Sequence, residues 1–220
     1  MILAKKWKLL AGRERALAFF LWCGGLALLT LGVVLTINGH LGAGGVDAMN
    51  FSMADALHVN TSIAIYITGI VSVLLAALVR RSRPNFLTFV SSIVMGLFTD
   101  FWKIVLAGVQ GTTLLSKIVI FVTGMLAIAF AVALTMCSIF PGSPVDDLLK
   151  AFVERGKRAW LVKILIEGFC GVVAFLLGGE LGLGTLLVVF GLGPFIDIFH
   201  TLLVKLGLDV DARVRKELEE

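Results

Sequence analysis

Six long apolar stretches, separated by short polar or glycine-rich segments, dominate the chain of 220 residues. Each stretch is close to the roughly 20 apolar residues that an α-helix needs to cross a bilayer. The polar C-terminal stretch "DVDARVRKELEE" follows them and is typical of a frayed or interfacial helix. The pattern therefore predicts an all-α membrane protein with six transmembrane helices. The predicted spans are residues 16–37, 62–79, 86–108, 115–137, 160–178 and 183–206.

The two halves of the chain resemble each other over most of their length. Residues 33–50 align without gaps with residues 132–149, and residues 88–106 align with residues 185–203 after a two-residue change in loop length. Shared leucine and valine mean little in membrane segments, but matched acids at consistent offsets indicate a duplication. The alignment pairs two aspartates of each half: Asp47 with Asp146, and Asp100 with Asp197.

Each aligned unit contains three spans, and an odd number of crossings inserts the two units in opposite orientations. The predicted organisation is therefore two inverted three-helix repeats. The predicted boundaries are a cytoplasmic basic segment at residues 1–15, repeats at 16–108 and 109–206, and a cytoplasmic tail at 207–220.

Between the first and second spans of each repeat lies a segment too polar for a span and too apolar for a free loop. Residues 39–59 and 138–157 each open with glycine or proline and continue as a short amphipathic helix. Irregular backbone at membrane depth survives only when it is buried in protein or lines a wet cavity. We expect a half-helix or re-entrant segment in each repeat. An amphipathic helix lying on the bilayer surface is the alternative.

Composition and charge agree with a membrane environment. The chain is 59% hydrophobic and 15% charged, with a mean hydropathy of +1.01, whereas soluble domains are about a quarter charged. Sixteen of the nineteen lysines and arginines fall on one side of the membrane if the chain crosses it six times. The positive-inside rule then predicts a multi-pass protein of the bacterial plasma (inner) membrane, with both termini cytoplasmic. The net charge of +4 thus reflects topology and does not indicate nucleic-acid binding.

Ionisable residues inside the predicted spans are costly, so they default to functional hypotheses. Asp100 and Lys103 are three residues apart on one helix face, where an acid and a base can touch. Asp197 and His200 occupy the equivalent positions in the second repeat. We expect these four residues to belong to a substrate or ion site between the repeats. The alternative is that the two pairs only hold the helix bundle together.

Other residues join the candidate site. Gly193 leaves space beside Asp197, and Pro194 frees a backbone carbonyl as a polar ligand. Lys163 and Glu167 form a pair four residues apart in the fifth span, and their first-repeat counterparts are uncharged. That asymmetry suits an asymmetric substrate, although Lys163 could instead extend its side chain to the cytoplasmic interface.

Asp47 and Asp146 fall in the first turn of the two half-helix segments and complete the candidate substrate- or ion-binding set. An acid there also favours the positive end of the helix dipole, and "SPVD" (residues 143–146) is typical of a serine cap with proline in the first helical position. These acids could therefore be structural. The chain has no nucleotide-binding loop, no H-E-x-x-H sequence and no metal-ligand spacing among its histidines and cysteines. The sequence predicts neither an enzyme, nor a cofactor, nor a metal site.

Two motifs resemble the YczE-like family of bacterial integral membrane proteins, which is grouped with YyaS and YitT proteins. They are "LGAGGVDAMN" (41–50) and "GLGTLLVVFGLGPFID" (182–197). The family motif commonly reads Gly-Pro-Trp-Asp where this chain has Gly45 and Val46 before Asp47, so only the aspartate carries over there. From the second motif, five residues carry over: Gly182, Gly184, Thr185, Gly193 and Pro194. The resemblance covers about residues 16–206 and implies a multi-pass membrane fold and, less specifically, a transporter.

The sequence favours a transporter of a small molecule or an ion, with a central charged site between inverted repeats. Its cargo could be a cationic or zwitterionic solute, or coupling protons; the sign of the cargo stays open because half-helix N-termini also attract anions. One alternative is a substrate-binding membrane subunit that needs an energising ATPase partner. Another is a scaffold or sensor that transports nothing. A homo-oligomer is compatible with each of them.

Overall fold

The apolar stretches of the sequence fold as helices, the only open-chain structure that satisfies every backbone N–H and C=O group within its own segment in lipid. The computed structural model describes residues 10–179 and 181–219, which contain helices and no strands. Six of these helices are long and apolar enough to cross a membrane: α2 (Gly12–Asn38), α4 (Thr61–Arg80), α5 (Phe86–Val105), α6 (Leu114–Met136), α8 (Ala159–Leu176) and α9 (Leu183–Lys205). The six predicted spans are confirmed, with ends that shift by four residues or fewer.

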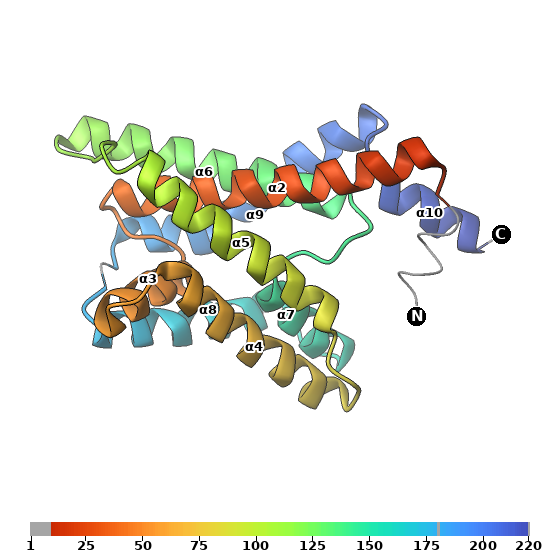
Figure 1. Ribbon diagram of the computed structural model, residues 1–220, viewed down its shortest axis with the longest axis horizontal. Coiled ribbons are helices and arrows are strands. Elements are labelled where there is room, and N and C mark those ends of the chain that lie inside the picture. The colour runs from red at the N-terminus through yellow and green to blue at the C-terminus, as the bar shows by residue number, and fades with distance from the viewer. Residues whose placement is uncertain (1–9, 180, 220) are drawn as a thin grey trace.

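Two short helices fill the segments that were expected to hold half-helices. These are α3 (Gly45–Leu57), between α2 and α4, and α7 (Pro144–Glu154), between α6 and α8. Neither is long enough to cross a bilayer, since about 20 residues are required. The helices form two layers, with α2, α6 and α9 in one and α3, α4, α7 and α8 in the other, and α5 crosses between them (Figure 1).

The closest helix packing is the crossing of α2 and α6. A Cβ atom added to Gly32 would lie 2.7 Å from the carbonyl oxygen of Gly124, and one added to Gly124 would lie 2.7 Å from the carbonyl oxygen of Gly32. The two backbones are therefore in direct contact, as small residues allow between membrane helices. Two turns before Gly32, Gly25 lies against Thr135, and Gly124 also lies against Thr36, one turn after Gly32. Both threonine hydroxyls donate 2.8 Å hydrogen bonds to the carbonyl three residues earlier, at Val33 and Val132.

Contacts within each layer join one half of the chain to the other, as α2 and α6 do in the first layer. Helix α3 packs on α8, and α4 packs on α7. Within the halves, α2 packs on α5 as α6 packs on α9, and α3 contacts α4 as α7 contacts α8. One correspondence is missing: α4 and α5 pack closely along their length, but α8 and α9 hardly touch.

The C-terminal segment folds as α10 (Val210–Glu219) and lies beside α2. Val210 and Val214 are fully buried among residues at the ends of α2, α6 and α9. The Val210 and Asp211 N–H groups both donate to the carbonyl oxygen of Cys137. The start of this helix is thus anchored to the bundle, so of the two expected forms, a frayed or an interfacial helix, the first does not apply to it.

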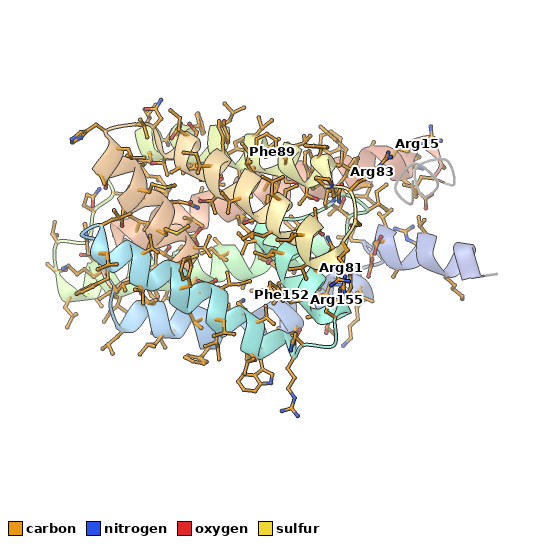
Figure 2. All side chains as sticks on the ribbon, turned by 90° about the horizontal axis from the view of Figure 1, so that it is seen from below. Arg15, Arg81, Arg83, Phe89, Phe152 and Arg155 are labelled. Atoms are coloured by element: carbon orange, nitrogen blue, oxygen red, sulfur yellow. The ribbon has the colours of Figure 1, made fainter. Side chains whose placement is uncertain are left out.

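Basic residues gather at the end of the molecule where α2 begins and α10 lies. Figure 2 places Arg15, Arg81, Arg83 and Arg155 toward that end, although they come from four different parts of the chain. Three of the sixteen basic residues predicted to lie on one side of the membrane, Lys5, Lys6 and Lys8, are outside the described residues.

Candidate functional site

Helix α3 begins beside the middle of α8. Gly45 opens α3 so close to α8 that an added Cβ atom would collide with the backbone carbonyl of Glu167 and would lie 3.1 Å from the Gly171 nitrogen. The Glu167 carboxylate accepts a 3.3 Å hydrogen bond from the Val46 N–H and another from the Gly45 N–H. An anion at this position neutralises the exposed N–H groups and the positive dipole of the helix start.

Four of the residues predicted from the sequence gather around this helix start and form what we call the acidic centre: Asp47, Asp146, Lys163 and Glu167. The Asp47 charge interacts with the other three, repelled by Glu167 and Asp146 and attracted by Lys163. Glu167 likewise interacts with Lys163 and Asp146. Three carboxylates and one ammonium leave a formal charge of −2 when all are ionised. The acidic centre therefore suits a cation or a proton better than an anion.

The second half-helix contributes Asp146 through a conventional helix start. Ser143 is the N-cap of α7, and its hydroxyl oxygen accepts a 3.2 Å hydrogen bond from the Asp146 N–H while donating a 3.0 Å bond to Asp146 Oδ2. Pro144 occupies the first helical position. The predicted serine cap and first-turn proline are confirmed. The Asp146 side chain remains exposed, so it is accessible as well as structural.

Asp100 and Lys103 lie elsewhere and each bonds the start of α4. The Asp100 carboxylate accepts a 3.2 Å hydrogen bond from the Ser62 N–H, and Lys103 Nζ donates a 2.7 Å bond to Thr61 Oγ1. Among the described residues the two side chains form no ion pair with each other, which differs from the expected contact. The unsatisfied N–H groups at the start of a helix offer Asp100 a better partner. This pair ties α5 to α4.

The equivalent residues of the second repeat have different surroundings. Asp197, Gly193 and Pro194 are all exposed on α9, and an added Cβ atom at Gly193 would meet nothing within 4 Å. At the equivalent Gly96 the same added atom would collide with the Tyr66 ring. The structure therefore does not bring Asp197 to the acidic centre or to the start of α8.

His200 faces a different carboxylate from the one expected. Its Nε2 atom lies 3.7 Å from Oδ2 of Asp209, which is in the turn after α9. The thiol of Cys137, which follows α6, is beside them. Burial, and then the Asp209 charge, raises the pKa of the Cys137 thiol to about 11. This group lies at the terminal end of the bundle, apart from the acidic centre.

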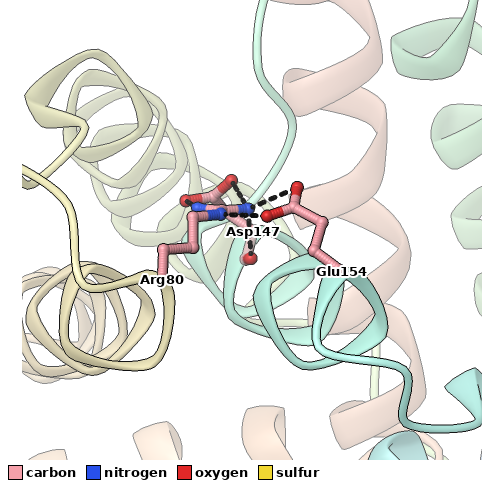
Figure 3. Close-up of polar contacts among 3 residues, drawn as sticks. All are labelled: Arg80, Asp147 and Glu154. Carbon is pink, nitrogen blue, oxygen red and sulfur yellow. Dashed lines mark hydrogen bonds and ion pairs between the residues drawn. The ribbon is translucent and has the colours of Figure 1, made fainter.

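The sequence did not single out the strongest ion-pair network in the described part of the chain. Arg80, at the end of α4, bonds Asp147 through both terminal nitrogens at 2.9 and 3.0 Å, and its Nε donates a 2.7 Å bond to Glu154 (Figure 3). The network clamps α4 of the first half to α7 of the second. The available signal in the sequence was the pair of acids, Asp147 and Glu154, which lie seven residues apart on one helix face.

A cavity of about 610 Å³ lies between α3 and α4 on one side and α7 and α8 on the other. Its lining is almost entirely apolar, and none of the predicted site residues contributes to it. Many lining residues come in pairs at equivalent positions of the two repeats: Met49 and Leu148, Met53 and Phe152, Ile67 and Ile166, and Val71 and Cys170.

Comparisons with known proteins place the chain among bacterial membrane proteins. It is 26% identical over 177 residues to "Uncharacterized protein YyaS" of Bacillus subtilis, covering 80% of this chain and 88% of that protein. It is 27% identical over 179 residues to "Uncharacterized membrane protein YczE" of the same organism, covering 80% and 81%. No solved structure matches. These relatives confirm the resemblance to YczE-like proteins and support a multi-pass membrane protein. Residues 16–201 match the family described as "Family of unknown function (DUF6198)", and the chain therefore belongs to that family.

Proposed function

We propose that the protein is a transporter that carries a small cation or a proton through the acidic centre, between two inverted repeats. Intramembrane carboxylates at a repeat interface are typical of such sites. Asp47 and Asp146 come from equivalent positions of the two repeats, whereas Lys163 and Glu167 come from the second alone. The cargo site is thus asymmetric on a nearly symmetric scaffold.

Pseudo-twofold symmetry is supported by details that the alignment did not use. Gly25 and Thr36 lie 99 residues before Gly124 and Thr135, respectively. The contact of Gly25 with Thr135 is therefore equivalent to that of Gly124 with Thr36 when the two repeats are exchanged. The paired lining of the apolar cavity obeys the same offset. An axis in the membrane plane, passing through the α2–α6 crossing and this cavity, accounts for both observations. It also favours the re-entrant interpretation of α3, which begins beside the middle of α8.

The observation that carries the proposal is a difference in helix packing between the two repeats. Gly69 and Gly96 are packed between α4 and α5, but their equivalents Gly168 and Gly193 have nothing within 4 Å. In inverted-repeat transporters, the two access states arise when the repeats exchange conformations around a fixed site. We infer that the observed state has α4–α5 closed and α8–α9 open. The opposite state closes α8 on α9 and opens the first repeat.

Disulfide cross-linking tests this exchange without knowledge of the cargo. The three native cysteines are replaced by alanine, and one new pair is introduced across each interface. Gly168→Cys with Val189→Cys reports closure of α8 on α9, because Val189 is equivalent to the Ser92 that contacts Gly69. Gly69→Cys with Ser92→Cys reports the closed first repeat. Both pairs are expected to cross-link in membranes within a single chain, the second faster than the first.

Two outcomes contradict the proposal. If only the first-repeat pair cross-links, the chain holds one conformation and the exchange does not occur. If the second-repeat pair gives only covalent dimers, the open face of α9 is an interface between two copies. A matched pair, Val172→Cys with Ile198→Cys, measures the random rate, because both positions are exposed and Ile198, nine residues from Val189, lies on the opposite face of α9.

The cargo is tested by neutralising the acidic centre. Glu167→Gln keeps an oxygen that can accept the Val46 N–H but removes the charge. Thermal unfolding of the purified protein is measured at two pH values against sodium, potassium, ammonium, guanidinium and choline. A cation that stabilises the parent protein is expected to lose its effect in Glu167→Gln and to keep it in Asp197→Asn. Equal stabilisation of both variants would remove the acidic centre as the cargo site.

We also propose that both termini face the cytoplasm. The support is the common location of Arg15, Arg81, Arg83 and Arg155 (Figure 2), because basic residues are retained on the cytoplasmic side.

The alternative to a self-contained transporter is a substrate-binding subunit of a modular importer. Uptake that requires ATP and no ion gradient would favour that alternative.

A further inference from the structure

Three side chains that commonly bind transition metals meet near the terminal end of the bundle. Cys137 is the C-cap of α6, His200 lies near the end of α9, and Asp209 lies in the turn before α10. The cysteine sulfur, a histidine ring nitrogen and an aspartate oxygen all lie within 4.8 Å of one another. This cysteine–histidine–aspartate site is separate from the acidic centre, and no spacing in the sequence indicated it.

We propose that these three residues bind a divalent transition-metal ion of the zinc class. Thiolate, imidazole and carboxylate are the protein ligands of zinc, at about 2.0–2.3 Å from the ion. Three atoms within 4.8 Å of one another have a common centre no more than about 2.8 Å from each, so small side-chain rotations complete the shell. Magnesium and calcium prefer sites made entirely of oxygen, and the thiol excludes them.

The surrounding structure already orients two of the ligands. Asp209 is the cap of α10, and its Oδ1 atom accepts a 2.9 Å hydrogen bond from the Ala212 N–H. Its Oδ2 atom is thereby turned toward His200, 3.7 Å away. The Cys137 carbonyl accepts N–H groups from Val210 and Asp211, which fixes the start of α10 beside the sulfur. Such outer hydrogen bonds are typical of built metal sites, where they hold the ligands in position.

Burial and access also suit a bound ion. Cys137 is fully buried, the Asp209 side chain is 13% exposed and the His200 side chain is 30% exposed. The exposed side, at His200, leaves room for a water molecule as the fourth ligand. A bound divalent cation deprotonates a coordinating thiol, so binding at Cys137 releases a proton.

The ion would connect the ends of α6 and α9 to the start of α10. Since α10 is otherwise held by two buried valines, two backbone hydrogen bonds and the Arg213–Glu14 ion pair, the metal adds a further anchor for this helix. This inference does not rest on the proposed transport function, and each can fail without the other.

Cobalt provides the direct measurement, because a cobalt–thiolate bond has a charge-transfer absorption in the near ultraviolet. The full-length protein is purified in detergent, its affinity tag is removed, and it is titrated with Co²⁺ and then with Zn²⁺. One equivalent of cobalt is expected to produce the band, and zinc is expected to displace it. Cys137→Ala and His200→Ala are expected to abolish the band. Cys23→Ala and Cys170→Ala, which remove the other two thiols, are expected to keep it.

Asp209→Asn distinguishes a specific loss of metal binding from unfolding of the variant. Asparagine can still cap α10, but it loses the anionic ligand, so the affinity for cobalt is expected to fall at least about tenfold while gel-filtration behaviour is unchanged. Alkylation of Cys137 gives a second reading and is expected to slow when zinc is present. Absence of the cobalt band in the folded parent protein, together with an alkylation rate that zinc does not change, would overturn the proposal.

Discussion

The helix pairs α4–α5 and α8–α9 are built from matched sequences but are packed differently. In the first pair, Gly69 makes room for the Ser92 side chain and Gly96 for the Tyr66 ring, and Asp100 bonds the start of the neighbouring helix. In the second pair the equivalent glycines face open space, and Asp197 is exposed. The same small residues and the same acid therefore do not dictate closure by themselves. The two pairs differ in whether a neighbouring helix packs against the glycines and the aspartate. That packing depends on the conformation of the whole chain and not on the local sequence.

Replacing the matched glycines Gly96 and Gly193 with a larger residue should give the largest difference in stability between the α4–α5 pair and the α8–α9 pair. Gly96→Leu forces a side chain into the Tyr66 ring and the Ser62 side chain, and such overpacking costs about 1–3 kcal/mol. Gly193→Leu adds its side chain to open space and should change stability by less than about 0.5 kcal/mol. Thermal unfolding in detergent measures both. Equal losses of stability would mean that α9 is packed in solution as α5 is.

The ion-pair clamp offers the next largest effect, because it has no counterpart in the other half. Arg80→Gln leaves Asp147 without its bidentate partner, and hydrogen bonds to charged groups contribute about 1.5–3 kcal/mol. We expect a loss near the lower end, since Arg80 is 21% exposed. Thermal unfolding measures the loss. Lys150→Gln, an exposed change on the same α7, is the matched control and should be nearly neutral.

The matched aspartates should show the smallest difference. Asp100→Ala removes the acceptor of the Ser62 N–H at the start of α4, and loss of such a cap costs about 1 kcal/mol. Asp197→Ala removes an exposed side chain and should cost less than half as much. Chemical unfolding of the two variants side by side provides the comparison. A larger loss for Asp197→Ala would show that the second pair also closes in the resting protein.

The sequence predicted the features that depend on local pattern. Span positions followed from apolar length alone, and the start of α7 followed from the serine and proline at residues 143 and 144. The repeat also drew attention to Asp47 and Asp146, which the structure brings near each other. Signals of this kind survive folding because they rest on neighbours in the chain.

Features that depend on conformation or on distant contacts were beyond the sequence. The alignment treats Asp100 and Asp197 as equals, so it could not indicate that one bonds a helix start and the other is exposed. The group of Cys137, His200 and Asp209 depends on a turn that returns the chain over the end of α6. The spacing of histidines and cysteines along the chain does not predict that turn.

The pairing of helices across the two halves has a consequence for how the protein is made. Helices α2 and α3 pack chiefly on α6 and α8, and α4 packs on α7 about as extensively as on α5. None of α6, α7 and α8 exists when the ribosome completes the third span. The surface of α2 at Gly32 is then exposed to lipid until Gly124 has been synthesised and inserted. The nascent first half is thus an unfinished membrane protein. Synthesis of the second half both doubles the chain and completes the fold of the first.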